Sequence, residues 1–173
     1  MPASMQPLRE EHRELLPEIE SLAVTADRIG AVSTSESKAS IASRLEFLRD
    51  HLRPHAQAED EVLYPVVARV MGSPDATATM RRDHVEVVRL TDELDRLFGS
   101  LVGDEPIAGQ LATDLRRVLY GLFAVISLHF AKEEEVYVPI LENGLMPDEA
   151  DELFRNMSAA HHRITNGEIQ HSH

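Results

Sequence analysis

The chain of 173 residues contains no cysteine, and aromatic residues make up only 5% of it. Without cysteine, the protein has no disulfides, no thiol nucleophiles and no cysteine-ligated zinc or iron–sulfur site. The absence of cysteine fits a reducing compartment. The first residues also lack the apolar run of a secretory signal. We therefore expect a cytoplasmic protein.

Positive charge is scarce as well. Lys and Arg number 17 against 30 Asp and Glu, which gives a net charge of −13. Such a surface repels phosphate backbones and anionic lipid, so we expect neither nucleic acid nor a membrane as a partner. The longest uncharged run, residues 118–131, is shorter than the roughly 20 residues that a membrane span needs. We expect this run to form a buried core helix.

Strand-like alternation is not sustained anywhere, and helical periodicity dominates. The predicted fold is all-α: an up-down-up-down antiparallel four-helix bundle followed by a short fifth helix after Pro147. Residues 1–145 would form the bundle, with Gly144 as a C-cap, and residues 146–173 the short helix and a histidine-containing tail. The four long helices are expected over about 7–30, 40–71, 76–98 and 107–143, with a Ser-rich linker over 31–39.

One sequence pattern occurs twice, as HAQAEDEVLYP over 55–65 and as HFAKEEEVYVP over 129–139. We call these the two repeat segments. Each begins with His, places Glu four residues later and ends with Pro. An interior proline removes a backbone hydrogen bond and bends a helix. The prolines therefore predict matched kinks at Pro65 and Pro139.

Helical spacing selects particular residues from the repeat segments. Positions i and i+4 differ by only ~40° around a helix, so the histidine and the first glutamate of each segment share a face. A further histidine on the preceding helix precedes each segment, and the antiparallel bundle can turn all these faces to a common axis. The candidate metal ligands are therefore His12, His55, Glu59, His84, His129 and Glu133.

Two buried carboxylates among four imidazoles require compensation, because an unpaired buried carboxylate is very costly. Two divalent metal ions would supply it, and imidazole with carboxylate suits iron, manganese or zinc. Each half of the chain would offer two histidines to one ion, while Glu59 and Glu133 bridge the two. The coordination positions left open are where water, oxygen or peroxide would bind.

Simpler interpretations exist for each residue taken alone. A single HxxxE pair is most often a solvated ion pair, and a lone inward histidine is usually a satisfied core residue. Only the complete set favours metal. Tyr137, one turn beyond Glu133, would either hydrogen-bond a ligand or simply pack, whereas Tyr64 has the wrong helical phase for that role. The remaining acids of the repeat segments are expected on the solvated face, with support of the ligands as the alternative: Asp60, Glu61, Glu134 and Glu135.

The segments EEHREL, HLRPHAQAEDEVLYP and HFAKEEEVYVPIL resemble the hemerythrin-like, HHE cation-binding domain over about residues 6–143. The H–HxxxE–H–HxxxE order is most similar to actinobacterial members. The resemblance implies a non-haem di-iron site, with zinc or manganese as substitutes. His12 and His55 would hold one iron and His84 and His129 the other. Glu59 and Glu133 would bridge them, together with an oxo, hydroxo or water ligand.

The chain departs from the oxygen-carrying hemerythrins, which have a further histidine where this chain has Val88 and an HxxxxD where it has HxxxE. This difference argues against reversible oxygen transport. Three hypotheses follow: a protein that binds or senses O₂, NO or peroxide; an oxidoreductase with weak peroxidase- or catalase-like activity; and a protein of iron homeostasis or iron-dependent regulation. A purely structural bundle is the remaining alternative.

Overall fold

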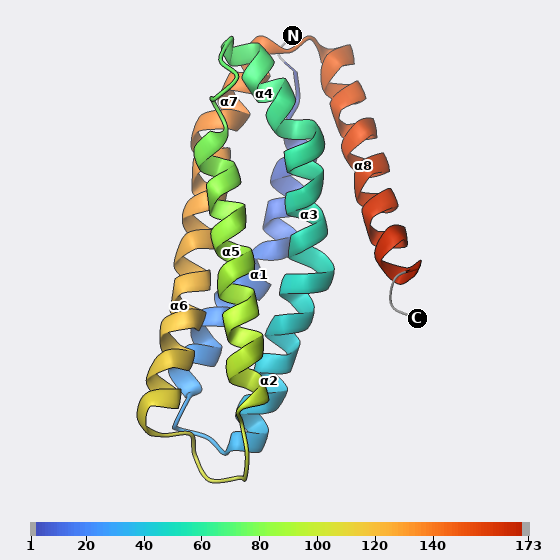
Figure 1. Ribbon diagram of the computed structural model, residues 1–173. Helices are drawn as coiled ribbons and strands as arrows, with labels where there is room; N and C mark the ends of the chain where they lie inside the picture. The colour runs from blue at the N-terminus through green and yellow to red at the C-terminus, as the bar shows by residue number, and fades with distance from the viewer. Residues whose placement is uncertain (1–2, 171–173) are drawn as a thin grey trace.

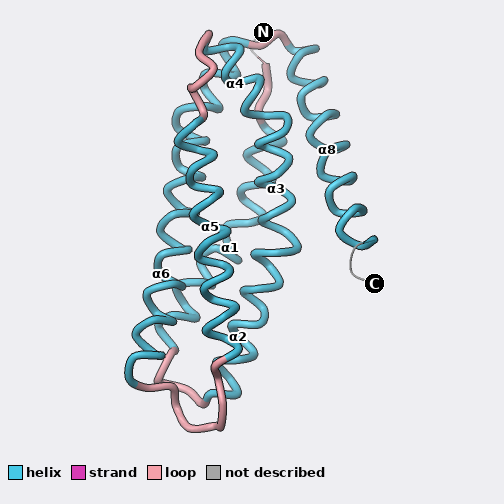
Figure 2. Tube along the Cα trace, in the orientation of Figure 1, coloured by secondary structure: helices cyan, strands magenta, loops and turns pink. Residues whose placement is uncertain are grey.

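The protein is a helical bundle. The computed structural model describes residues 3–170, and every regular element within that range is a helix (Figures 1 and 2). Four long rods run side by side, their loops gathered at the two ends, and successive rods are antiparallel. The predicted all-α bundle is confirmed. The last three residues of the predicted tail lie outside the described residues.

The rods are built from labelled segments, some of them π-helical and marked η. The first rod is α1 (Gln6–Arg28), and the third is α5 (Ala78–Gly99). The second is one continuous helix made of α2 (Thr34–Glu46), η1 (Phe47–Leu52), α3 (Arg53–Ala58), η2 (Glu59–Leu63) and α4 (Tyr64–Met71). The fourth comprises α6 (Gly109–Lys132), η3 (Glu133–Tyr137) and α7 (Val138–Gly144).

The second rod begins earlier than predicted, because its start is capped. The Ser33 hydroxyl accepts a hydrogen bond from the Glu36 amide, and the Glu36 carboxylate accepts one from the Ser33 amide. This reciprocal capping box satisfies two amides that the first turn would leave unpaired. Most of the predicted linker is therefore helix. At the other end of the rod, Gly72 takes a left-handed conformation with φ 65° and stops the helix, as predicted.

In the second and fourth rods, the prolines lie just after the π-helical segments, whereas Pro17 lies within the α-helical first rod. Pro54, Pro65 and Pro139 each follow the end of a π segment by two residues. Proline has no N–H to donate, and its ring clashes with the carbonyl four residues earlier. A π turn closes over one more residue than an α turn, so it relieves that clash without ending the helix. The predicted kinks are thus widened turns, and the rods continue through them.

The buried side chains form two apolar clusters along the bundle axis. One contains Ile19, Leu52, Leu90, Ile126 and their neighbours. The other contains Leu8, Leu63, Met80, Leu141 and their neighbours. In every rod, the predicted metal-ligand residue lies between a member of the first cluster and a member of the second. The polar residues are therefore enclosed by apolar side chains on both sides.

The fifth helix is present but is longer than expected. Helix α8 (Pro147–Gln170) lies beside α3 and η2 on the outside of the bundle (Figure 1). Its apolar side chains Leu153, Met157 and Ala160 are buried. Arg163 pairs with Glu61 of the first repeat segment. Among residues 3–170, no helix has the length and apolarity to cross a bilayer.

Gly144 is predicted to be required by packing. Its predicted role as the C-cap is wrong, because Gly144 is the last residue of α7 and Leu145 is the C-cap. The φ of Gly144 is not positive, and a Cβ placed there would lie 2.3 Å from Cγ1 of Val70. Gly144→Ala should therefore lower the free energy of unfolding by about 1–3 kcal/mol through overpacking. Chemical denaturation would measure it. Gly99→Ala is the control, because a Cβ there meets nothing within 4 Å. Equal stability of the two variants would contradict the prediction.

Candidate metal centre

The structure brings the six predicted ligand residues together between the two apolar clusters. Helices α1 and α5 supply one histidine each, α3 and α6 the other two, and the glutamates are the first residues of η2 and η3. Glu59 and Glu133 are fully buried, and only the side chain of His84 exceeds a tenth exposed, at 11%. The six residues are His12, His55, Glu59, His84, His129 and Glu133.

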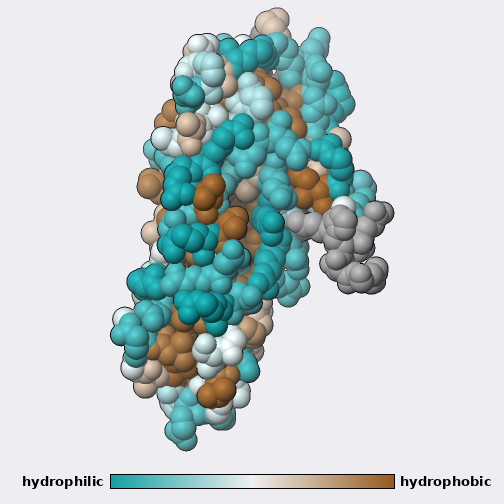
Figure 3. Space-filling view, in the orientation of Figure 1, coloured by the Kyte–Doolittle hydropathy of each residue, from teal (hydrophilic) through white to brown (hydrophobic). Residues whose placement is uncertain are grey.

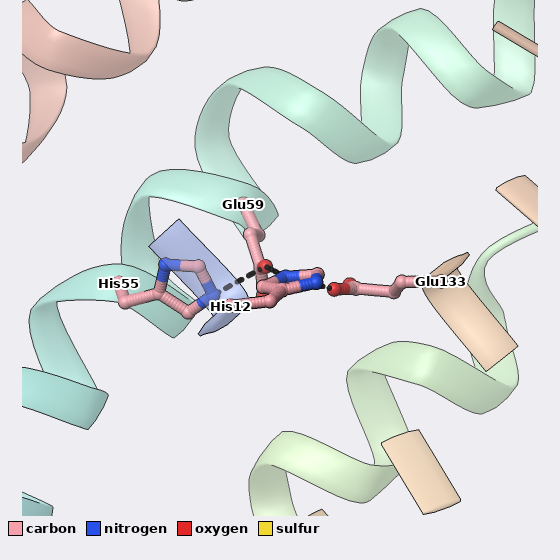
Figure 4. A group of neighbouring side chains, drawn as sticks. All are labelled: His12, His55, Glu59 and Glu133. Carbon is pink, nitrogen blue, oxygen red and sulfur yellow. Dashed lines mark ion pairs between the residues drawn. The ribbon is translucent and has the colours of Figure 1, made fainter. Parts of the chain in front are cut away.

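The first subsite consists of His12 and His55 with both glutamates (Figure 4). His55 Nε2 lies 2.7 Å from Glu59 Oε1, and His12 Nε2 lies 3.0 Å from Glu133 Oε2. A distance of 3.8 Å separates His12 Nε2 from Glu59 Oε1. Ligand atoms of all four residues fall within 4.8 Å of one another. A single ion with bonds of about 2.0–2.2 Å could contact them all after small adjustments.

The second subsite consists of His84 and His129, with the other oxygens of the same glutamates. His84 Nε2 lies 3.2 Å from Glu59 Oε2, and His129 Nε2 lies 3.2 Å from Glu133 Oε1. The two imidazole nitrogens are 3.1 Å apart. Each glutamate therefore presents one oxygen to each subsite, which is what a carboxylate bridging two ions must do.

Tyr64 extends into the second subsite. Its hydroxyl donates a hydrogen bond to Glu133 Oε1 at 2.8 Å and lies 3.1 Å from His129 Nε2 and 3.3 Å from His84 Nε2. The side chain is fully buried. With a longer hydrogen bond to Glu59 Oε2 at 3.5 Å, the phenol contacts four of the predicted ligands, although α-helical spacing predicts that this tyrosine is out of phase.

The π-helical segments explain why Tyr64 lies in the metal centre and Tyr137 lies outside it. Tyr137 donates its hydroxyl to the carbonyl of Ala76 at 2.9 Å, so of its two alternatives the structure shows the packing role. The phase expected for Tyr64 and Tyr137 from the sequence is that of a regular α-helix. Because a π turn contains an extra residue, the fifth residue after a glutamate returns to its face rather than the fourth. Tyr64 is the fifth residue after Glu59.

Each of the four imidazoles meets a carboxylate at its outer nitrogen, Nδ1. This contact orients the ring and leaves Nε2 facing the cluster. The distances from Nδ1 are 2.8 Å for His12 to Glu134 and for His55 to Glu11, 3.0 Å for His129 to Asp83, and 3.1 Å for His84 to Asp60. Asp60 and Glu134 therefore support the histidines. This is the alternative expected from the sequence; the favoured expectation was a solvated face.

These four acids obey a rule that the sequence does contain. Two directly precede a helix-borne histidine, as Glu11 precedes His12 and Asp83 precedes the histidine of α5. The other two directly follow the buried glutamates, as Asp60 follows Glu59. Each acid then reaches across to a histidine on another helix. The repeat therefore includes the supporting acids as well as the ligands, but only the packing of the rods shows which ring each acid contacts.

The buried charges hold one another in their ionised forms. Burial alone raises the pKa of Glu59, but His55 and the other imidazoles outweigh it and hold that pKa well below its ordinary value. Burial alone lowers the pKa of His12, but Glu133 and Glu59 outweigh it and raise the pKa to about 9. The same carboxylates raise the pKa of His129 to about 10. Without metal, the cluster is thus a set of imidazolium–carboxylate pairs.

Those pairs leave atoms unsatisfied. Four atoms of the first subsite are buried without an aligned hydrogen bond, despite their short separations: His12 Nε2, His55 Nε2, Glu59 Oε1 and Glu133 Oε2. Buried polar atoms normally have partners, and orphaned ones require an explanation. Once the imidazoles have lost their protons, the four atoms are lone-pair donors that lie close together. Their types, neutral nitrogen and anionic oxygen, then fit a divalent transition-metal ion.

A four-helix bundle with histidines and glutamates projecting into its core from facing helices defines a helical metal-binding protein. The family model of the hemerythrin HHE cation-binding domain matches the chain twice, over residues 5–119 and 75–167. The chain belongs to this family and is a domain that binds metal cations. Searches of the curated proteins and of the solved structures found no match.

The two family matches reflect the internal repeat. They begin 70 residues apart, and His12 and His84 are 72 residues apart. The second match therefore begins where the second half of the chain starts to repeat the first. This agrees with the geometry, in which each half supplies two histidines and one glutamate to a common cluster.

The metal-free protein is predicted to lose stability as pH rises from about 6.5 to 10. The pKa values of His12 and His129 are raised from 6.5 to about 9 and about 10, so their stabilisation is complete below 6.5 and is lost above those values. Melting of chelator-treated protein across this range would measure it. Glu133→Gln should flatten the dependence. A melting temperature that rises with pH in the metal-free protein would contradict the prediction.

Proposed function

We propose that this domain holds two iron ions, one at each subsite, and binds O₂, NO or peroxide there. One observation supports the proposal most directly: each glutamate divides its two oxygens between the subsites. Glu59 turns Oε1 to His12 and His55 and Oε2 to His84 and His129. Glu133 turns Oε2 to His12 and Oε1 to His129. A simple ion-pair network would not require both carboxylates to be divided between the same two pairs of histidines. When bound, iron would supply open coordination positions for a small ligand.

The surroundings of the cluster suit such a ligand. Phe130 stacks on the His12 ring with centroids 4.3 Å apart and lies 5.8 Å from the His55 ring. Together with the two apolar clusters, it shields the His12 ring from bulk water. Low local polarity strengthens the electrostatic contacts within the site. The four outer acids also carry negative charge, which would balance the added cations.

Iron content tests the first part of this proposal. Full-length protein purified without a metal-chelating resin should contain about two irons per chain. Glu133→Gln should weaken metal binding at both subsites, because each would lose a charged oxygen. Glu135→Gln, from the same π-helical segment but exposed, is the matched control. Zinc alone, no metal, or equal iron in the two variants would refute the di-iron assignment.

Tyr64 favours a second candidate, an oxidoreductase that consumes peroxide. Its hydroxyl oxygen lies 2.8 Å from Glu133 Oε1 at the second subsite, where its proton can be given to an oxygen atom of a bound ligand. Burial, with the charges of Glu59 and Glu133, holds the pKa of this tyrosine well above its ordinary value. The phenol therefore keeps its proton until a cation or a ligand changes the local charge.

A pair of tyrosine variants separates these roles. Tyr64→Phe should retain about two irons but lower peroxide consumption by roughly 10²-fold or more, as expected for loss of a proton donor. Tyr137→Phe removes a hydroxyl that bonds Ala76 instead, and should leave consumption unchanged. Peroxide consumption and iron content would be measured on both variants. If the wild-type iron protein consumes no peroxide, or if Tyr64→Phe is fully active, the oxidoreductase candidate fails and binding remains.

A further inference from the structure

A cavity of about 400 Å³ leads from the surface to the cluster. It lies between the second rod and α5, with α6 behind it. Among the described residues, α5 packs closely on α6 and α2 but has little direct packing with α3. The cavity therefore occupies the gap that α5 and α3 leave beside the site. In Figure 3, apolar residues are visible between the polar ones on the face that α5 and α3 share.

The inner end of the cavity is the cluster itself. His55, Glu59, His84 and His129 all line it. Val88 lines it too, one helical turn after His84 on α5, and is 43% exposed. Because valine offers no ligand atom, the space beside His84 stays open. A molecule in the cavity would therefore contact the second subsite without leaving the protein interior.

The size of the cavity exceeds what a diatomic gas or peroxide requires. A water molecule occupies about 30 Å³ in the liquid, whereas pockets for organic ligands start at about 300 Å³. The walls are mainly aliphatic and aromatic: Leu48, Leu52, Ala56, Val87, Ile126 and Phe130. Filling such a space with apolar atoms is favourable, because both surfaces leave water.

The mouth carries charges that largely cancel. Arg49 pairs with Asp95 at 2.8 Å, and Arg81 lies 3.5 Å from Asp60. The third guanidinium at the mouth, that of Arg53, is matched in number by the carboxylate of Asp92, which also lines the cavity. Since the charges balance, the mouth has no excess of positive charge to select an anion. A neutral molecule suits it better.

We infer that the cavity binds a neutral, largely apolar organic molecule of about ten non-hydrogen atoms, with a hydroxyl or hydroperoxyl group directed at the second subsite. This rests on the proposed function in that it identifies the class of ligand that the same site takes. Alkyl and aryl hydroperoxides and the corresponding alcohols belong to this class. The apolar body lies along Leu52, Val87 and Phe130, and the oxygen end faces His84 and His129.

Direct binding of an alcohol probe tests the inference. The probe is 2-phenylpropan-2-ol, which has the expected size, an apolar body and one hydroxyl. Calorimetry and ligand-observed NMR would use the full-length protein, both iron-loaded and chelator-treated. We expect a Kd of about 1 mM or lower for a molecule of this size. Benzoate, of similar size but anionic, should bind at least about tenfold more weakly.

Two variants locate the site. Val88→Phe and Ala56→Leu fill the cavity from opposite walls and should each weaken probe binding by about tenfold or more. Val24→Phe on α1 is the matched control, because Val24 is also an exposed helical valine (56%) but does not line the cavity. Melting curves would verify that all three variants fold. If one cavity variant does not fold, the other still tests the inference.

The outcomes separate this inference from the proposed function. Binding lost in both cavity variants and kept in Val24→Phe supports it. No probe binding to iron-loaded wild type, binding unaffected in the cavity variants, or tighter binding of benzoate each overturns it, whatever the iron content. If the chain takes up no iron but binds the probe in a Val88-dependent way, the cavity is supported and the di-iron proposal alone fails.

Discussion

The burial of two carboxylates in the centre of the bundle is the constraint on which the rest of the structure depends. Glu59 and Glu133 are fully enclosed between two apolar clusters, where an uncompensated charge would be very costly. Four imidazoles surround them, and four outer acids hold the imidazoles in position. This arrangement tolerates the metal-free state through protonated histidines. It also offers metal ions the same nitrogens once those protons leave.

The fold and the ligand set could be predicted because both are periodic. The rods follow from helical spacing of apolar residues, and the ligands follow from His and Glu four apart, duplicated in segments 74 residues apart. What spacing could not supply was the local change of helix type. A π segment precedes Pro54, Pro65 and Pro139, and the phase of the residues after each of these segments shifts. For this reason Tyr64 lies in the site, whereas Tyr137 lies outside it and bonds the carbonyl of Ala76.

The supporting acids were missed for a different reason. Their positions beside the ligands are visible in the sequence, as with Glu11 before His12 and Glu134 after Glu133. Each, however, serves a histidine on another helix, so its partner depends on how the rods pack. A helical wheel describes only one rod and assigns such acids to its solvated side. The partner of each acid is therefore set by the packing of the helices against one another, which the sequence of a single helix does not contain.

The repeat is symmetric in its ligands and asymmetric in what surrounds them. At the position where the first repeat segment has Tyr64, the second has Val138, which is buried and carries no polar atom. The phenol therefore serves only the second subsite. The cavity borders both histidines of that subsite, His84 and His129, but only one histidine of the first, His55; His12 lies outside its lining. The hydroxyl of Tyr64 and the larger part of the cavity's polar lining thus meet at the second subsite. On the proposed function, the duplicated ligands would supply two places for metal, and these two unduplicated features would give the places different tasks: the first subsite would hold an ion, whereas the second, with Tyr64 and both of its histidines on the cavity, would meet the ligand.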